Sequence, residues 1–231
     1  MSIAVIGAGN MGRAIACRLV TGGHDVLLAD EDTAKAESVA AEIAPLGGGT
    51  VRAAPARDAA DIAGIVVLAT LYDVSTRVAA ELSELLDGKI VVDISNPFNG
   101  TFNGLTTPEG SSAGEEIARR VPGARVVKAF NTTFAPVLFA GTLDETPIDV
   151  LLASDDDGAK DRVARIVKSG RLRPIDAGAL ANSRTLERIT LLLVELQGRY
   201  ELDFQATLRF LPGRVEHTTF DPSLDAAAAT G

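Results

Sequence analysis

Residues 3–12 read IAVIGAGNMG, four apolar residues followed by Gly7-Ala8-Gly9-Asn10-Met11-Gly12. The G-x-G-x-x-G pattern alone is a weak signal, because glycines are common in turns. Here it follows an apolar strand and opens a helix expected over residues 11–20, and a second strand ends at Asp30, 23 residues after Gly7. The combination of strand, glycine turn, helix, strand and acidic residue predicts a dinucleotide-binding unit.

Each glycine of this turn has a physical reason in such a unit. Gly7 permits the tight turn, Gly9 lets the backbone approach a pyrophosphate, and Gly12 allows close packing of helix on strand. Asn10 and Met11 begin the helix, whose unpaired N–H groups and partial positive charge attract phosphates. The alternative interpretation is a glycine-rich turn that binds nothing.

Short apolar runs alternate with segments of helical period from the first residues to about residue 198. The early runs are continuous rather than alternating, as is typical of strands covered on both faces. The pattern predicts an α/β fold, a Rossmann-type doubly wound, mostly parallel sheet with a small C-terminal helical extension. About eight strands are expected, at residues 3–6, 25–29, 51–53, 65–69, 90–93, 125–129, 148–152 and 172–175.

We expect three parts along the chain. Residues 1–178 form the dinucleotide-binding domain, residues 179–211 a helical part that closes a substrate cleft, and residues 212–231 an irregular tail. The last helix, at about residues 183–196, carries apolar side chains on one face, which favours a homodimer.

Composition excludes several classes of function. The 231 residues are 46% hydrophobic and 23% charged with a net charge of −9, as expected for a soluble globular protein without nucleic acid or an anionic membrane as its main partner. The single cysteine, Cys17, allows no internal disulfide and no cysteine zinc cluster, and no metal site is indicated. No secretory signal and no run of about 20 apolar residues is present, so a cytoplasmic protein is expected.

Asp30 bears on the choice of dinucleotide. A carboxylate at the end of the second strand accepts hydrogen bonds from the adenosine ribose hydroxyls and repels a 2′-phosphate. Glu31 and Asp32 follow, with no cation nearby before Lys35, although Asp32 also suits a helix cap. These residues favour NAD over NADP.

Other candidate residues follow later strands, at the edge where a doubly wound sheet binds its ligand. Thr70 and Leu71 follow the fourth strand. Asn96 and Pro97 follow the fifth and would lie beside the nicotinamide, or form a plain turn.

The sixth strand ends in Lys128, Asn131 and Thr132, interleaved with aromatic residues that suit a planar-ring pocket or core packing. Lys128 is a candidate proton donor, with a solvated lysine at a strand end as the alternative. The site lacks an obvious acid–base pair, which is compatible with hydride transfer between two cofactors that supply the chemistry themselves.

Several segments together resemble one family. They are IAVIGAGNMG at residues 3–12, VKAFNT at 127–132, LRPIDAG at 172–178 and NSR at 182–184. In this order they are similar to the NADPH-dependent reductases of the deazaflavin coenzyme F420, and more distantly to the cytosolic reductase domain of the six-transmembrane metalloreductases. The resemblance covers about residues 1–211. It implies a Rossmann domain, a small helical C-terminal part, a homodimer, and hydride transfer between a nicotinamide and a deazaflavin.

The sequence departs from that family in two places. Asp30, Glu31 and Asp32 stand where its members usually carry Ser or Thr and Arg for the 2′-phosphate, and Asn131 stands in place of a His.

Three hypotheses about function follow. The first is an oxidoreductase that passes a hydride between NAD or NADP and F420 or a flavin-like acceptor. The second is an NAD(P)H-dependent reductase of a small imine or carbonyl substrate. The third is a dinucleotide-binding redox sensor without catalysis.

Overall fold

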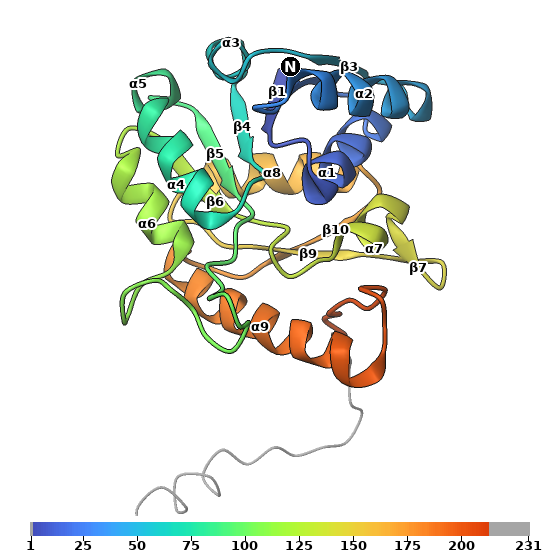
Figure 1. Ribbon diagram of the computed structural model, residues 1–231, viewed down its shortest axis with the longest axis vertical. Coiled ribbons are helices and arrows are strands. Elements are labelled where there is room, and N and C mark those ends of the chain that lie inside the picture. The colour runs from blue at the N-terminus through green and yellow to red at the C-terminus, as the bar shows by residue number, and fades with distance from the viewer. Residues whose placement is uncertain (1, 213–231) are drawn as a thin grey trace, which may run out of the picture.

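The computed structural model describes residues 2–212, and its core is a parallel sheet with helices on both faces (Figure 1). Six strands of this part of the chain form the sheet, in the order β3-β2-β1-β4-β5-β6. The order reverses direction beside β1, and this switch point opens a crevice at the carboxyl ends of β1 and β4. The strands are β1 (Ser2–Ile6), β2 (Asp25–Ala29), β3 (Thr50–Ala53), β4 (Ile65–Leu68), β5 (Ile90–Asp93) and β6 (Arg125–Lys128).

Nine α-helices lie within the described residues. They are α1 (Asn10–Thr21), α2 (Thr33–Ile43), α3 (Ala56–Ile62), α4 (Tyr72–Glu81), α5 (Ser83–Leu86), α6 (Ala113–Arg120), α7 (Ala135–Ala140), α8 (Asp157–Ser169) and α9 (Ser183–Tyr200). Short 3₁₀ turns cover Ala44–Leu46 and Leu180–Asn182.

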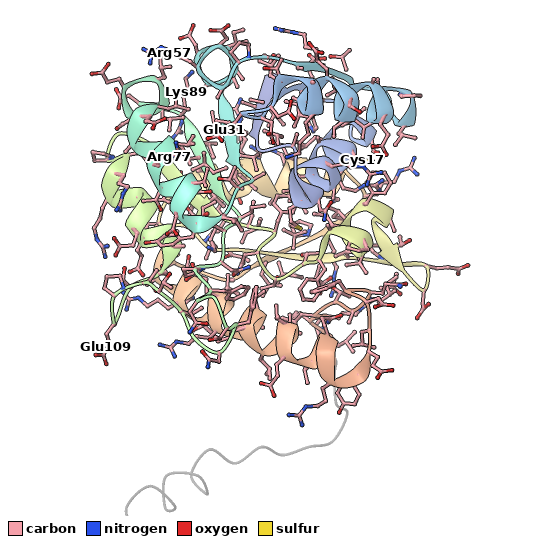
Figure 2. The ribbon with its side chains drawn as sticks, viewed as in Figure 1. Cys17, Glu31, Arg57, Arg77, Lys89 and Glu109 are labelled. Atoms are coloured by element: carbon pink, nitrogen blue, oxygen red, sulfur yellow. The ribbon has the colours of Figure 1, made fainter. Side chains whose placement is uncertain are left out.

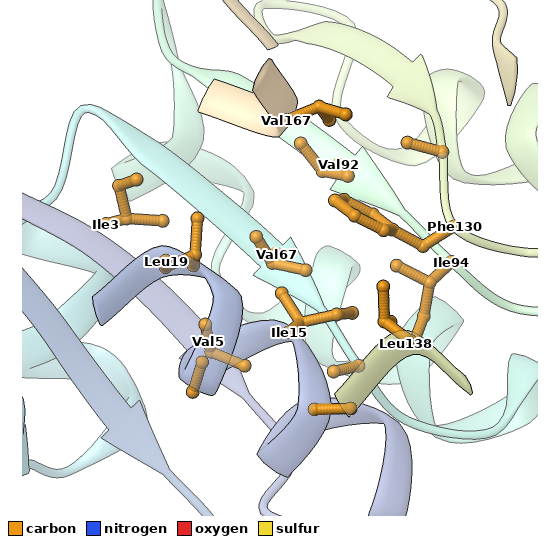
Figure 3. Packing of buried hydrophobic residues seen from close by; sticks show 14 of the residues in the cluster. Ile3, Val5, Ile15, Leu19, Val67, Val92, Ile94, Phe130, Leu138 and Val167 are labelled. Atoms are coloured by element: carbon orange, nitrogen blue, oxygen red, sulfur yellow. The ribbon is translucent and has the colours of Figure 1, made fainter. Parts of the chain in front are cut away.

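The inner strands β1 and β4 are almost wholly apolar, as expected for strands whose two faces are both buried. In β1, Ile3 and Val5 point into one hydrophobic core, whereas Ala4 and Ile6 point into the other. Helices α1, α2, α7 and α8 cover the first core, and α3 to α6 cover the second. Figure 3 shows the first core, where Ile15 of α1 packs among Val5, Val67 and Leu138. The predicted α/β doubly wound fold is confirmed.

The expected count of about eight strands in the sheet is slightly too high. Strands β9 (Asp149–Leu152) and β10 (Arg173–Asp176) exist, but they pair in parallel with each other as a separate ladder. This ladder meets β6 only through one antiparallel bridge, between Lys128 and Ala153. A short hairpin of β7 (Thr142–Leu143) and β8 (Thr146–Pro147) precedes it. An apolar run predicts a buried strand, but not the partner or the direction of its pairing.

Helix α9 extends four residues beyond its predicted end and stops at Tyr200. Leu186 is buried and Leu193 packs against the first core, whereas the side chain of Leu192 is 54% exposed. Within residues 2–212, no helix combines the length and the apolar character needed to cross a bilayer. The tail predicted for residues 212–231 lies outside the described residues except for Pro212.

Candidate functional site

A cavity of about 640 Å³ lies at the carboxyl ends of β1, β2, β4 and β5. Its volume is in the range of small-molecule and cofactor sites. It runs from Asp30 and Glu31 at one end, past the glycine turn, to Asn96 and Phe98. The lining residues that carry the argument are Gly7, Gly9, Asn10, Met11, Asp30, Glu31, Lys35, Thr70, Leu71, Arg77, Ser95, Asn96 and Phe98.

The three glycines of the turn serve two different purposes. Gly7 has φ +111°, and a Cβ there would lie 2.4 Å from the carbonyl oxygen of Ala69. A Cβ on Gly12 would lie 1.7 Å from the carbonyl oxygen of Gly7. A Cβ on Gly9, which lines the cavity, would meet no protein atom within 4 Å. Gly7 and Gly12 are therefore required by the fold, whereas space at Gly9 is available to an occupant of the cavity.

The amino end of α1 faces this space. Gly9 is its N-cap and has no side chain to accept hydrogen bonds from the first-turn N–H groups. Asn10 and Met11 begin the helix and line the cavity. These donors and the positive end of the helix dipole suit a phosphate group.

Asp30 is held in place at the end of β2. Its carboxylate accepts hydrogen bonds from the N–H of Ala8 at 2.7 Å, the N–H of Asp32 at 3.2 Å and the Nζ of Lys35 at 3.0 Å. Burial by itself would raise the pKa of Asp30, but these hydrogen bonds outweigh it and hold the pKa below its ordinary value. Asp30 is therefore an ionised acceptor beside the glycine turn, as a ribose ligand requires.

The rim around Asp30 holds more positive charge than the local sequence indicated. Arg77 lies on α4, and its guanidinium pairs with Glu31 at 3.1 Å. Both residues are labelled in Figure 2. Lys35 pairs with Asp30, while the carboxylate of Asp32 caps α2 by accepting from the N–H of Lys35. The expectation of an acidic rim with no nearby cation before Lys35 is wrong, because Arg77 pairs with Glu31. The local sequence could not reveal this pair, since the two residues are 46 positions apart.

The ends of β4 and β5 form the rest of the wall. Thr70 and Leu71 line the cavity, and Leu71 is 80% exposed, so it offers an apolar contact to a ligand. Asn96 also lines the cavity. Pro97 is buried instead, and its carbonyl accepts a hydrogen bond from the N–H of Thr106 at 2.7 Å.

The three predicted catalytic residues lie behind the wall. Asn131 and Thr132 are each 2% exposed, Lys128 is fully buried, and none of them lines the cavity. Asn131 is linked to the wall, because its amide nitrogen donates to the Oδ1 of Asn96 at 3.0 Å and its carbonyl accepts from the amide of Asn96 at 2.9 Å. Their direct catalytic roles stay predictions.

Lys128 is not a solvated lysine, so that interpretation is wrong. Its Nζ donates to Asp93 and Glu187, both at 2.8 Å, and to the carbonyl of Ser95. Burial by itself would lower the pKa of Lys128, but the two carboxylates outweigh it and raise the pKa. Glu187 comes from α9, 59 residues away, so strand-end position alone could not reveal this burial.

The lining residues that sequence reasoning missed include Ser95, Phe98 and Arg77. Ser95 and Phe98 adjoin the predicted Asn96-Pro97 pair, so a wider window at that strand end would have included them. Arg77 could have been considered because a helix that follows a parallel strand starts at the ligand-binding edge.

The contrast between the glycines gives a prediction. Gly9→Val should abolish dinucleotide binding and leave the far-UV circular dichroism nearly unchanged, because the new side chain would enter only the cavity. The matched control is Gly12→Ala, which should lose the native fold, since its Cβ overlaps the carbonyl of Gly7. Isothermal titration with NADH and NADPH measures binding. Unweakened binding by Gly9→Val would mean that the ligand does not lie over this turn.

The chain is similar to several known proteins. The family described as "NADP oxidoreductase coenzyme F420-dependent" matches residues 2–97. The F420-dependent NADP reductase of Methanothermobacter marburgensis is 33% identical over 85% of this chain and 92% of its own length. Metalloreductase STEAP3 of Rattus norvegicus is 29% identical over 83% of this chain and 37% of its own length.

A solved structure from Arthrobacter sp. FB24, provisionally named an F420-dependent NADP reductase, has a TM-score of 0.75. It is 31% identical, and the alignment covers 87% of this chain and 95% of that one. Identity above 30% over nearly the full length of both chains, together with the cavity over the glycine turn, leads to one conclusion. The chain belongs to the F420-dependent NADP reductase family and is an oxidoreductase.

Proposed function

We propose that this chain transfers a hydride between a nicotinamide dinucleotide and a deazaflavin of the F420 type, or a related flavin. The observation that carries the proposal is the continuous cavity from Asp30 past Gly9 to Asn96. It offers, in a row, an acceptor for ribose hydroxyls, a helix end for the pyrophosphate and a polar wall for a nicotinamide. The family supports the second substrate, since its curated members are named for F420 and NADP.

The chain's own contribution is orientation. When bound, the dinucleotide supplies or accepts the hydride at its nicotinamide ring. Asp30 and the turn at Gly9 hold the distant half of that molecule, while Ser95 and Asn96 lie where its reactive ring would rest. Leu71 and Phe98 offer apolar contacts to the bound molecules. Holding two rings in contact geometry accounts for catalysis without an acid–base pair at the reacting carbon.

The finer proposal is a preference for NADH over NADPH. It rests on the anchored Asp30 carboxylate, which stands where a 2′-phosphate would approach. Lys35 and Arg77 offset part of the repulsion, because each pairs with a carboxylate of the rim. The remaining repulsion should amount to about 1–2 kcal/mol, or roughly 5- to 30-fold in affinity.

We also propose a homodimer and a cytoplasmic location. The partly exposed apolar face of α9, including Leu192, supports the homodimer. A single cysteine, which allows no internal disulfide, fits a protein of a reducing compartment.

The hydride acceptor is tested first. Purified protein is supplied with NADH or NADPH and with F420, FMN, FAD and a set of small imines and carbonyls. Oxidation of the dinucleotide, followed at 340 nm, should be fastest with the deazaflavin or a flavin. Turnover only with an imine or carbonyl would overturn the proposal, and so would tight dinucleotide binding without turnover, as expected of a redox sensor.

The cofactor preference is tested by kcat/KM for NADH and NADPH. Asp30→Ser with Glu31→Arg should narrow or reverse the preference, because it removes the repulsion and adds a guanidinium that can bind the phosphate. Arg77→Met should increase the preference for NADH, because it removes a cation from the rim of the cavity. Asp32→Ser is the matched control, since serine keeps the cap of α2 and this carboxylate is not part of the cavity lining. An NADPH value equal to or above the NADH value in the unmodified protein would contradict the preference.

The homodimer is tested by light scattering at micromolar concentration. The expected mass is twice the 24.0 kDa of one chain. Leu192→Glu should lower it towards one chain, because it places a charge on the apolar face of α9. A mass of one chain for the unmodified protein would exclude the homodimer at that concentration.

A further inference from the structure

A fully buried cluster of three charged side chains lies directly behind the cavity wall. Asp93 ends β5, Lys128 ends β6 and Glu187 lies on α9, and all three are 0% exposed. The three protons of the Lys128 ammonium are all used, by Asp93, Glu187 and the carbonyl of Ser95. The Lys128 ammonium is therefore fully hydrogen-bonded inside the protein, without solvent.

The cluster holds Ser95 from three sides. The Oδ1 of Asp93 accepts from the N–H of Ser95 at 2.9 Å and from its hydroxyl at 2.7 Å. Lys128 donates to the carbonyl of the same residue. Ser95 lines the cavity, and so does the next residue, Asn96. The wall at the nicotinamide end is thus fixed by Asp93 and Lys128.

The same cluster fixes α9. Both carboxylate oxygens of Glu187 accept from the N–H of Ala113 at the start of α6, at 3.0 and 3.2 Å. One turn further along α9, the hydroxyl oxygen of Thr190 accepts from the amide of Asn131 at 3.3 Å, and the same amide donates to the Oδ1 of Asn96 at 3.0 Å. Helix α9 therefore reaches the cavity wall by two routes, through Lys128 to Ser95 and through Asn131 to Asn96.

Stability alone does not explain three charges in this place. A buried ion pair costs much of its own attraction in desolvation, and apolar residues of similar size often stabilise a core as well or better. Burial also raises the pKa of Glu187, so the carboxylate is held in an unfavourable environment. Directional contacts to a cavity residue are what a charged group provides here and an apolar one would not.

We propose that Lys128 is a positioning residue that fixes Ser95 and Asn96 relative to α9. It touches neither the dinucleotide nor the acceptor. It sets the part of the wall on which the nicotinamide rests, and it makes that position depend on the docking of α9. The inference rests on the proposed function for its kinetic consequence, but not for its structural one.

The test removes the ammonium without leaving an unpaired buried charge. The triple variant Lys128→Met, Asp93→Asn and Glu187→Gln keeps acceptors for the N–H groups of Ser95 and Ala113 and fills the volume of the lysine stem. Glu187→Gln alone is a milder variant that keeps Lys128 and its hydrogen bond to the carbonyl of Ser95. The matched control is Lys160→Met, which removes a nearly buried lysine that pairs with Asp157 and Asp176 far from the cavity lining.

Two readouts are measured on the full-length protein. In the triple variant, kcat should fall by about 10- to 100-fold while the Kd for NADH stays within about threefold, because a displacement of about 1 Å at the reacting ring costs rate rather than distant binding contacts. Hydrogen exchange should accelerate at Ser95, Asn96 and residues 187–190 together. Glu187→Gln should give a smaller change of the same kind, and Lys160→Met none at these positions.

A triple variant with unchanged kcat and unchanged exchange at Ser95 and α9 would overturn the proposal. Faster exchange spread evenly over the chain would do the same, since it would show a purely structural role. If none of the acceptors supports oxidation of NADH by the unmodified protein, the proposed function fails. The hydrogen-exchange measurement then still decides whether Lys128 positions Ser95 and Asn96.

Discussion

The turn between β1 and α1 leaves no room for a side chain at two positions, and the rest of the site depends on that constraint. Gly12 packs against the carbonyl of Gly7, and Gly7 packs against the carbonyl of Ala69 after β4. This close approach brings the amino end of α1 to the switch point of the sheet. There the connections that leave β1 and β4 run in opposite directions. Gly9 is left with open space before it, and it lines the cavity.

Charged side chains fix the position of both ends of the site. Asp30 is tied to the glycine turn through the N–H of Ala8, so its carboxylate keeps a fixed position relative to the amino end of α1. At the other end, Lys128 ties the wall residue Ser95 to α9. The two ends differ in exposure: the ion pair between Arg77 and Glu31 lies at the surface and can rearrange, whereas the Lys128 cluster is closed to solvent. The side chains of the surface pair can therefore exchange partners, whereas those of the buried cluster cannot do so without exposing a charge.

Local patterns in the sequence predict the motif, the doubly wound fold and the strand ends to within one residue, because apolar period, glycine spacing and caps act over a few residues. They do not predict partners that meet only in the folded chain. Arg77 reaches Glu31 across 46 residues, and Glu187 reaches Lys128 across 59, so an acidic rim and a solvated lysine were both reasonable and both wrong. The separate β9–β10 ladder was not predictable for the same reason, since the residues of an apolar strand do not indicate which strand it pairs with.

Isotope transfer tests the central claim most directly. The unmodified protein is given NADH labelled with deuterium at one or the other C4 position, together with a deazaflavin acceptor in ordinary water, and the products are analysed by mass spectrometry. A hydride passed between two rings held in contact predicts that deuterium from one C4 position, and not from the other, appears in the reduced acceptor. Deuterium lost to water, or transferred equally from both positions, would contradict direct transfer in a site that holds the nicotinamide in one orientation.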